Sequence, residues 1–221
     1  MEKVVLLNEY RLGDMRALYY IGHETKNVEL MLLPDDVKPV SWDEKKQVVD
    51  SLIQIKLAGD TYQGGYAGGG TLRQGESVFR LQHCHQESHT SDEKTEIVTR
   101  LKDSRGYLAE HILTWYHGAE SVEMYTVFHN ESEQKVSLEM ISSFSLGGIT
   151  PCTPGDAGET LKVHRIRSVW SMEGRLETQA VEDLQLEPSW AGHAVRAERF
   201  GQVGSMPVNH YFPFVAGEDE K

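Results

Sequence analysis

The chain is poor in cysteine, in basic residues and in long apolar runs. The shortage of cysteine excludes a disulfide-rich protein, and the lack of long apolar runs excludes a membrane-spanning one. Two cysteines, Cys84 and Cys152, among 221 residues are too few for a disulfide framework. No apolar run reaches the roughly 20 residues that a membrane-spanning helix needs, and the first residues lack the layout of a signal peptide. We therefore expect a cytoplasmic protein without a membrane partner.

The shortage of basic residues excludes a further class of partner. The chain has 34 acidic and 22 basic residues, which gives a net charge of -12. A nucleic-acid backbone would be repelled by this charge, so we expect no nucleic-acid partner. Hydrophobic residues make up 39% of the chain and charged residues 25%, an ordinary balance for a globular protein with a buried core.

Short apolar or alternating runs of strand length occupy most of the sequence, whereas helix signals are few. Helices are suggested only at Ser41–Asp50 and Ala180–Leu186. We predict an all-β fold, an antiparallel β-sandwich with few short helices, as a single domain over residues 1–221. The predicted strands are Lys3–Leu7, Met15–Ile21, Val28–Leu33, Ser51–Leu57, Ser77–His83, Thr95–Leu101, Tyr107–Tyr116, Ser121–His129 and Lys135–Phe144.

A cluster of histidines is the first candidate for chemistry. His83 and His85 would point to one face of a strand, and His89 follows nearby, so the three are candidate metal ligands. In the cupin metal motif a glutamate follows the second histidine by several residues, whereas Glu87 follows His85 by two. The other interpretation is a polar strand end that runs into a loop over Glu87–Lys94. Our main expectation is that the chain binds no metal and no cofactor, and a metal-dependent β-enzyme stays an alternative.

The glycine-rich segment Gly64–Gly70 is the second candidate. It matches neither the dinucleotide-binding fingerprint nor the phosphate-binding loop, so it is either a wide turn or a loop that lies against a flat ligand. In the second case Tyr62 and Tyr66 would stack on the ligand, and Asp60 and Arg73 would bond its hydroxyl groups. Proteins bind sugars through aromatic faces and charged hydrogen-bonding groups of this kind.

A complete active site is not recognisable in the sequence. There is no Gly-x-Ser-x-Gly elbow, and neither cysteine lies in a catalytic signature. Adjacent acids such as Asp35-Asp36 and Glu182-Asp183 are typical of solvated surface segments. We therefore assign no catalytic residue.

Three segments together resemble a known family. They are residues 60–73 (DTYQGGYAGGGTLR), 161–176 (LKVHRIRSVWSMEGRL) and 200–214 (FGQVGSMPVNHYFPF). They are similar to the N-terminal region of bacterial α-galactosidases of glycoside hydrolase family 36. This resemblance implies a β-supersandwich, related to galactose mutarotase, that precedes a (β/α)₈ catalytic barrel. It also implies that the chain is an incomplete N-terminal domain of a larger glycosidase, which forms a homo-oligomer.

The resemblance also implies the roles of three residues. The catalytic aspartates of the family lie in the barrel, one of them in a Lys-Trp-Asp motif that this chain lacks. The N-terminal region contributes a loop and a tryptophan to the galactose subsite, and by position these correspond to Asp60, Arg73 and Trp170. The implied function is a non-catalytic domain that supports the barrel, oligomerisation and the binding of galactose or an α-galactoside. The alternative is a stand-alone carbohydrate-binding or structural module.

Two roles are open for Trp170, a buried core residue or a residue that contacts sugar, and they predict different positions for its side chain. A tryptophan sealed in the core would stabilise the fold by about 3–5 kcal/mol relative to alanine. A tryptophan that contacts sugar would instead lie at a strand end with one face open.

Overall fold

The computed structural model describes residues 3–38, 49–61, 75–150, 158–172, 174–186, 198, 200 and 210–220. Within these ranges it has twelve strands and one short helix, so the predicted all-β, sandwich-like fold is confirmed. The chain divides into two compact units, Met1–Gly64 with Leu72–Ile149, and Gly65–Thr71 with Thr150–Lys221. The single domain over residues 1–221 stays a prediction.

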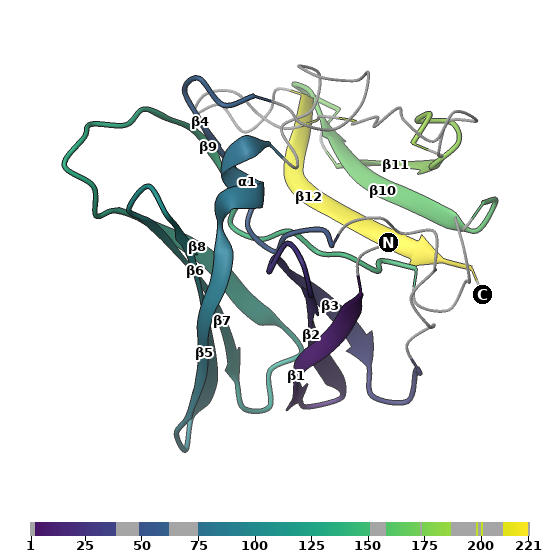
Figure 1. Cartoon of the computed structure of the whole chain (residues 1–221). Coiled ribbons are helices and arrows are strands. Elements are labelled where there is room, and N and C mark those ends of the chain that lie inside the picture. The colour runs from purple at the N-terminus through teal and green to yellow at the C-terminus, as the bar shows by residue number, and fades with distance from the viewer. Residues whose placement is uncertain are drawn as a thin grey trace. The chain divides into compact units, whose positions relative to one another are not determined.

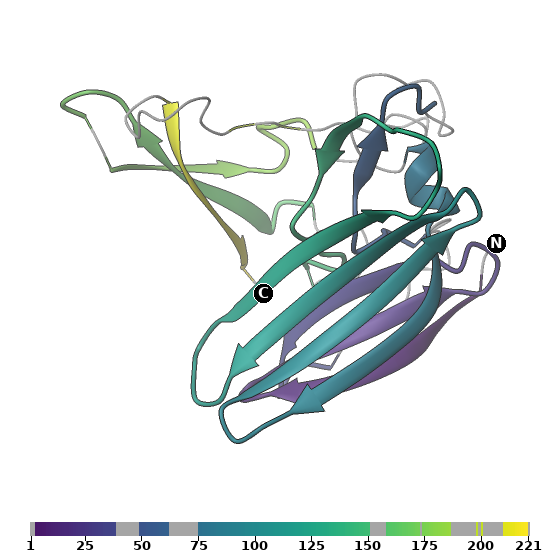
Figure 2. The same ribbon diagram turned by 90° about the vertical axis from the view of Figure 1, so that its left-hand side faces the viewer.

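The first unit is built from two antiparallel sheets that lie face to face (Figures 1 and 2). One sheet has the order β1-β2-β3, the other has the order β5-β6-β7-β8, and a two-stranded ladder joins β4 to β9. The bounds are β1 Val4–Leu12, β2 Met15–Gly22, β3 Val28–Pro34, β4 Ile55–Leu57, β5 Gln82–Thr90, β6 Lys94–Asp103, β7 Tyr107–Tyr116, β8 Val122–Asn130 and β9 Leu138–Ile141.

The core of this unit lies between the two sheets. Alternation along each strand directs every second side chain inward, so Tyr19 and Leu30 of one sheet share a cluster with Ile97, Leu101 and Leu113 of the other. All five are fully buried. Each fully buried large apolar side chain contributes roughly 1.5–3 kcal/mol relative to an exposed one.

The sheet β1-β2-β3 is buried on its second face as well. Leu18, Tyr20, Met31 and Leu33 form a separate buried cluster there. This double burial explains why β2 and β3 are continuous apolar runs rather than alternating ones.

One predicted strand of this unit is wrong. The segment Ser77–His83 begins instead in a helix, α1 (Glu76–Arg80), and β5 starts only at Gln82. Val78 and Leu81 are both buried, and their spacing of three residues is that of one helix face. An alternation of polar and apolar residues over so few positions also fits one turn of helix.

The ends of three other predicted strands differ from the structure. β1 (Val4–Leu12) continues five residues beyond the predicted strand Lys3–Leu7. β9 covers only Leu138–Ile141 of the predicted strand Lys135–Phe144, and it pairs with β4 rather than with β8. In Ser51–Leu57 only the last three residues form a strand, β4. Both Leu52 and Ile53 are fully buried, so the segment before β4 packs on two sides and has no solvent face.

The second unit contains one antiparallel sheet of order β11-β10-β12, with β10 (Leu161–Ser168), β11 (Arg175–Ala180) and β12 (His210–Asp219). Arg165 of the central strand is almost completely buried. Its guanidinium pairs with Glu177 at 2.5 Å and with Glu198 at 3.0 Å, and it lies 5.0 Å from the ring centre of Tyr211.

The helix predicted over Ala180–Leu186 is wrong, because β11 extends to Ala180 and turns follow it. The other predicted helix, Ser41–Asp50, lies mostly outside the described residues.

His111 of β7 is a titratable group inside the first core. It is fully buried, and neither ring nitrogen has a hydrogen-bond partner in the described part of the chain. Burial penalises the imidazolium and lowers the pKa of His111 to about 4.

This pKa predicts a loss of stability in mild acid. The unfolded histidine, with a pKa near 6.5, takes up a proton before the folded one does, so the free energy of unfolding falls as the pH drops from about 6.5 towards 4. Between pH 7 and pH 5 the wild type should lose about 2 kcal/mol more than His111→Leu, which has no group to titrate there. Urea unfolding at both pH values measures the difference, and equal losses in the two proteins would contradict it.

Candidate functional site

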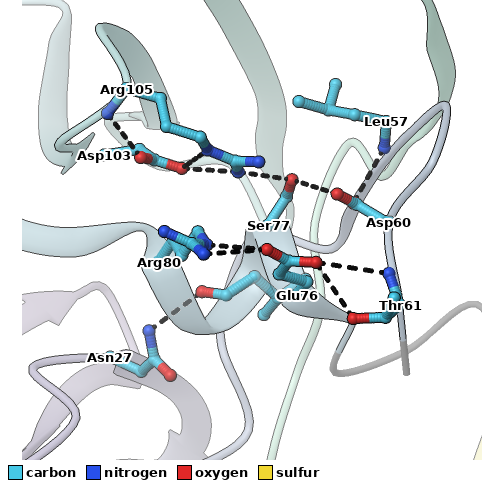
Figure 3. A network of polar contacts seen from close by, with 10 residues as sticks. Asn27, Leu57, Asp60, Thr61, Glu76, Ser77, Arg80, Asp103 and Arg105 are labelled. Atoms are coloured by element: carbon cyan, nitrogen blue, oxygen red, sulfur yellow. Dashed lines mark hydrogen bonds and ion pairs between the residues drawn. The ribbon is translucent and has the colours of Figure 1, made fainter. Parts of the chain in front are cut away.

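A network of polar contacts surrounds Asp60, which precedes the glycine-rich segment Gly64–Gly70 in the sequence (Figure 3). Oδ2 of Asp60 accepts a hydrogen bond from the backbone N–H of Leu57 at 2.9 Å, which closes the turn after β4. Oδ1 accepts a hydrogen bond from the hydroxyl of Ser77 at 2.8 Å. Both carboxylate oxygens therefore have partners within the protein.

Arg105 continues this network from the turn between β6 and β7. Its Nη2 donates to Oγ of Ser77 at 2.8 Å and to Oδ2 of Asp103 at 2.6 Å. The Asp103 side chain is 1% exposed. Burial lowers the pKa of Arg105, but the hydrogen bonds and charge of Asp103 outweigh this effect and raise it. A line of contacts from Asp103 through Arg105 and Ser77 to Asp60 therefore ties the turn after β4 to α1 and to the turn between β6 and β7.

A second clamp joins the residues that border the segment over residues 62–74. The carboxylate of Glu76 accepts a hydrogen bond from the Thr61 hydroxyl at 3.0 Å, and the backbone N–H of Glu76 donates to the Thr61 carbonyl at 2.9 Å. Arg80 donates to the other carboxylate oxygen at 3.0 Å. The hydrogen bonds from Thr61 and then from Arg80 lower the pKa of Glu76. The borders of the glycine-rich segment are thus held together.

The helix α1, which contains Glu76 and Arg80, is also held by hydrogen bonds from Asn27. This fully buried amide donates to the carbonyl oxygens of Val78 at 3.1 Å and Leu81 at 2.8 Å. Val78 lies in the last turn of the helix, and Leu81 is its C-cap residue. Asn27 lies just before β3, so it secures the helix to the sheet β1-β2-β3.

Asp60 was predicted from the sequence as a flank of a sugar-binding loop, and the structure gives it an anchoring role as well. Its partner Ser77, and Arg105, which reaches Asp60 only through Ser77, were not singled out. No motif marks them as neighbours of Asp60, because Ser77 and Arg105 are 17 and 45 residues away in the sequence and belong to different elements. The other expected flank, Arg73, lies outside the described residues, as do Tyr62 and Tyr66.

Trp170 lies in the turn that follows β10 and is 77% exposed. The interpretation of Trp170 as a sealed core residue is therefore wrong, because β10 ends at Ser168 and the strand alternation does not reach the tryptophan. Val169, Met172 and Leu176 of the same hairpin are also exposed. We call these four exposed apolar residues of the hairpin, Trp170 included, the hairpin patch.

The histidines do not form the expected cluster. His83 pairs with Leu101 and His85 pairs with Arg100, so a bulge at Cys84 turns the two imidazoles to opposite faces of the sheet. The expected shared face is thus wrong, and so is the loop over Glu87–Lys94, since β5 extends to Thr90. Among the described residues no group of three or more His, Cys, Asp or Glu side chains is placed to hold a metal ion.

His85 and His89 belong instead to a charged row on the outer face of the sheet β5-β6-β7-β8. Their Nε2 atoms lie 3.7 and 3.5 Å from one carboxylate oxygen of Glu87, whose other oxygen pairs with Arg100 at 2.6 Å. Arg100 also pairs with Glu110 at 2.7 Å. The hydrogen bond from Arg100 is the main cause of a lowered pKa at both glutamates. This row cross-links three strands.

Fold and site together define an all-β antiparallel sandwich protein with a polar network around Asp60 and an exposed tryptophan hairpin. No family model, no curated protein and no solved structure matches the chain. Within the described ranges no helix has the length and apolarity needed to cross a membrane.

The anchoring role of Asp60 predicts a cost in stability. Asp60→Ala removes an acceptor from both Leu57 N–H and the buried Ser77, so the free energy of unfolding should fall by about 1–3 kcal/mol. Asp36→Ala is the control, because Asp36 is exposed and has no hydrogen bond to the described residues. Urea unfolding compares the two variants, and a loss no larger than that of the control would show that Asp60 does not anchor the segment.

Proposed function

We propose that this chain is the non-catalytic sandwich domain of an α-galactosidase-like glycoside hydrolase and forms part of its galactose subsite. In this proposal a separate barrel domain supplies the catalytic aspartates. The chain supports that barrel, and the assembled cytoplasmic enzyme is a homo-oligomer. The substrate is an α-galactoside.

The exposure of Trp170 is the observation that carries the proposal. A tryptophan with 77% of its surface in solvent leaves a large apolar face unburied, and such a face is the usual contact for the C–H side of a sugar ring. Arg167, one strand position before the turn, has a side chain that is 59% exposed. Its guanidinium lies 3.6 Å from a carboxylate oxygen of Glu177. A planar guanidinium supplies donors for sugar hydroxyl groups.

The location of the resembling segments supports the proposal further. Residues 161–176 span β10 and the hairpin patch, and residues 200–214 extend into β12, the strand beside β10. The segment 60–73 begins at the anchored Asp60. The resemblance therefore covers the exposed hairpin and the base of the glycine-rich segment, and the sandwich fold has the class that the resemblance implies.

A stand-alone carbohydrate-binding module is the second candidate, because the same tryptophan would serve it. The two candidates differ in the partner that they require. Under the main proposal a barrel from the same enzyme raises the affinity for galactose, whereas a stand-alone module binds the sugar equally well without one. Binding measured with and without a barrel domain distinguishes them.

The proposal predicts separate effects of Trp170→Ala on binding and on stability. The affinity for methyl α-galactoside should fall about tenfold, since the stacking face is lost, while the free energy of unfolding should change by no more than about 0.5 kcal/mol. Isothermal titration calorimetry and urea unfolding measure the two effects. Tyr125→Ala is a matched control, because Tyr125 is an exposed aromatic residue of the first unit. Unchanged affinity in Trp170→Ala would contradict the proposal.

The assignment as non-catalytic makes a further prediction. The purified chain should not hydrolyse an aryl α-galactoside, because retaining glycosidases of this kind need two carboxylates about 5–5.5 Å apart across the scissile bond and none is assigned here. Release of the coloured aglycone provides the assay. Turnover that disappears when one of the chain's own acidic residues is replaced would overturn the assignment.

A further inference from the structure

A small cavity lies at one end of the first unit, away from the network around Asp60. It has a volume of about 200 Å³ and lies between the turn that joins β1 to β2 and the turn that joins β7 to β8. Leu12, Leu32, Trp115 and Val122 supply apolar walls, and Asp14 and Glu120 border the same cavity. All six residues belong to the first unit.

The indole of Trp115 is held in a fixed position in this cavity. Its Nε1 donates to the carbonyl of Ala119 at 2.8 Å, which uses its only polar atom. Gly13 has a φ of +69°, and a Cβ at this position would lie 3.1 Å from Cζ2 of Trp115. The glycine therefore permits both the left-handed turn and the close approach of the indole. The wall of the cavity is formed before any ligand arrives.

The two carboxylates at the cavity have no charged partner among the described residues. Asp14 and Glu120 are exposed, and neither carboxylate has a hydrogen bond or ion pair to a residue in the described ranges. Two arginines lie beside the β1–β2 turn. Arg11 donates to the Gly13 carbonyl at 3.3 Å and pairs with Asp35 at 2.6 Å, and Arg16 pairs with Glu9 at 3.0 Å. Because both arginines already have an acidic partner, the two carboxylates remain as acceptors.

We propose that this cavity binds a small organic cation, an ammonium group attached to an apolar body. The apolar body would lie against Trp115 and the aliphatic walls, and the ammonium would donate to Asp14 and Glu120. Anions are disfavoured by both carboxylates, and a sugar would find acceptors here but few donors. The volume is below the roughly 300–1,000 Å³ of sites for drug-sized ligands, so the ligand has about ten non-hydrogen atoms.

A titration of the full chain followed by ¹H–¹⁵N NMR tests this site. The probes are benzylammonium, its neutral counterpart benzyl alcohol, and galactose. Benzylammonium should shift the indole N–H signal of Trp115 and bind about fivefold tighter than benzyl alcohol, because only the cation attracts the two carboxylates. The titrations extend to about 20 mM, above the millimolar dissociation constant expected of so small a ligand.

Two variants connect the preference to the carboxylates. In Asp14→Asn/Glu120→Gln the affinities for benzylammonium and benzyl alcohol should become equal, whereas Glu133→Gln should keep the fivefold preference. Glu133 is a matched control, since it is an exposed glutamate in the turn at the other end of β8. Equal affinities in the wild type, binding of galactose in preference to benzylammonium, or no shift of the Trp115 signal would each overturn the proposal.

Discussion

The face-to-face burial of two antiparallel sheets is the constraint on which the first unit depends. Side chains alternate between the two faces of a strand, so a register shift by one residue in β2 or β7 would move Tyr19 or Leu113 out of the core between the sheets to the other face of its own sheet. The paired strands therefore have little freedom in their register. The short elements around them, β4 and α1, are fixed by what they contribute to the same core, Ile55 and Val78.

The strands that the sequence predicted well are those in which apolar pattern and turn residues agree. β2, β3, β6, β7 and β8 are examples, since each ends at polar or glycine-containing turns. Three features were not predictable in this way. The helix α1 is too short for its periodicity to differ from that of a strand, the bulge at Cys84 depends on the partner strand, and the pairing of β4 with β9 joins segments about 80 residues apart.

The candidate site was predictable only in part, for a similar reason. Asp60 was noted because it borders a glycine-rich segment, but its partner Ser77, and Arg105, which bonds Ser77, come from different elements and carry no motif. A buried charged group such as Asp103 adds geometric definition more than stability, because desolvation offsets much of the attraction to its partner. The exposure of Trp170 followed from the end of β10 at Ser168, which alternation alone did not reveal.

The central claim is that the exposed face of Trp170 contacts galactose. A crystal structure of the protein grown with galactose tests this claim most directly. The account predicts a sugar ring stacked on the indole of Trp170, with at least one hydroxyl group bonded to a charged side chain of this protein. A structure in which galactose binds elsewhere, or in which another part of the protein covers the indole, would contradict it.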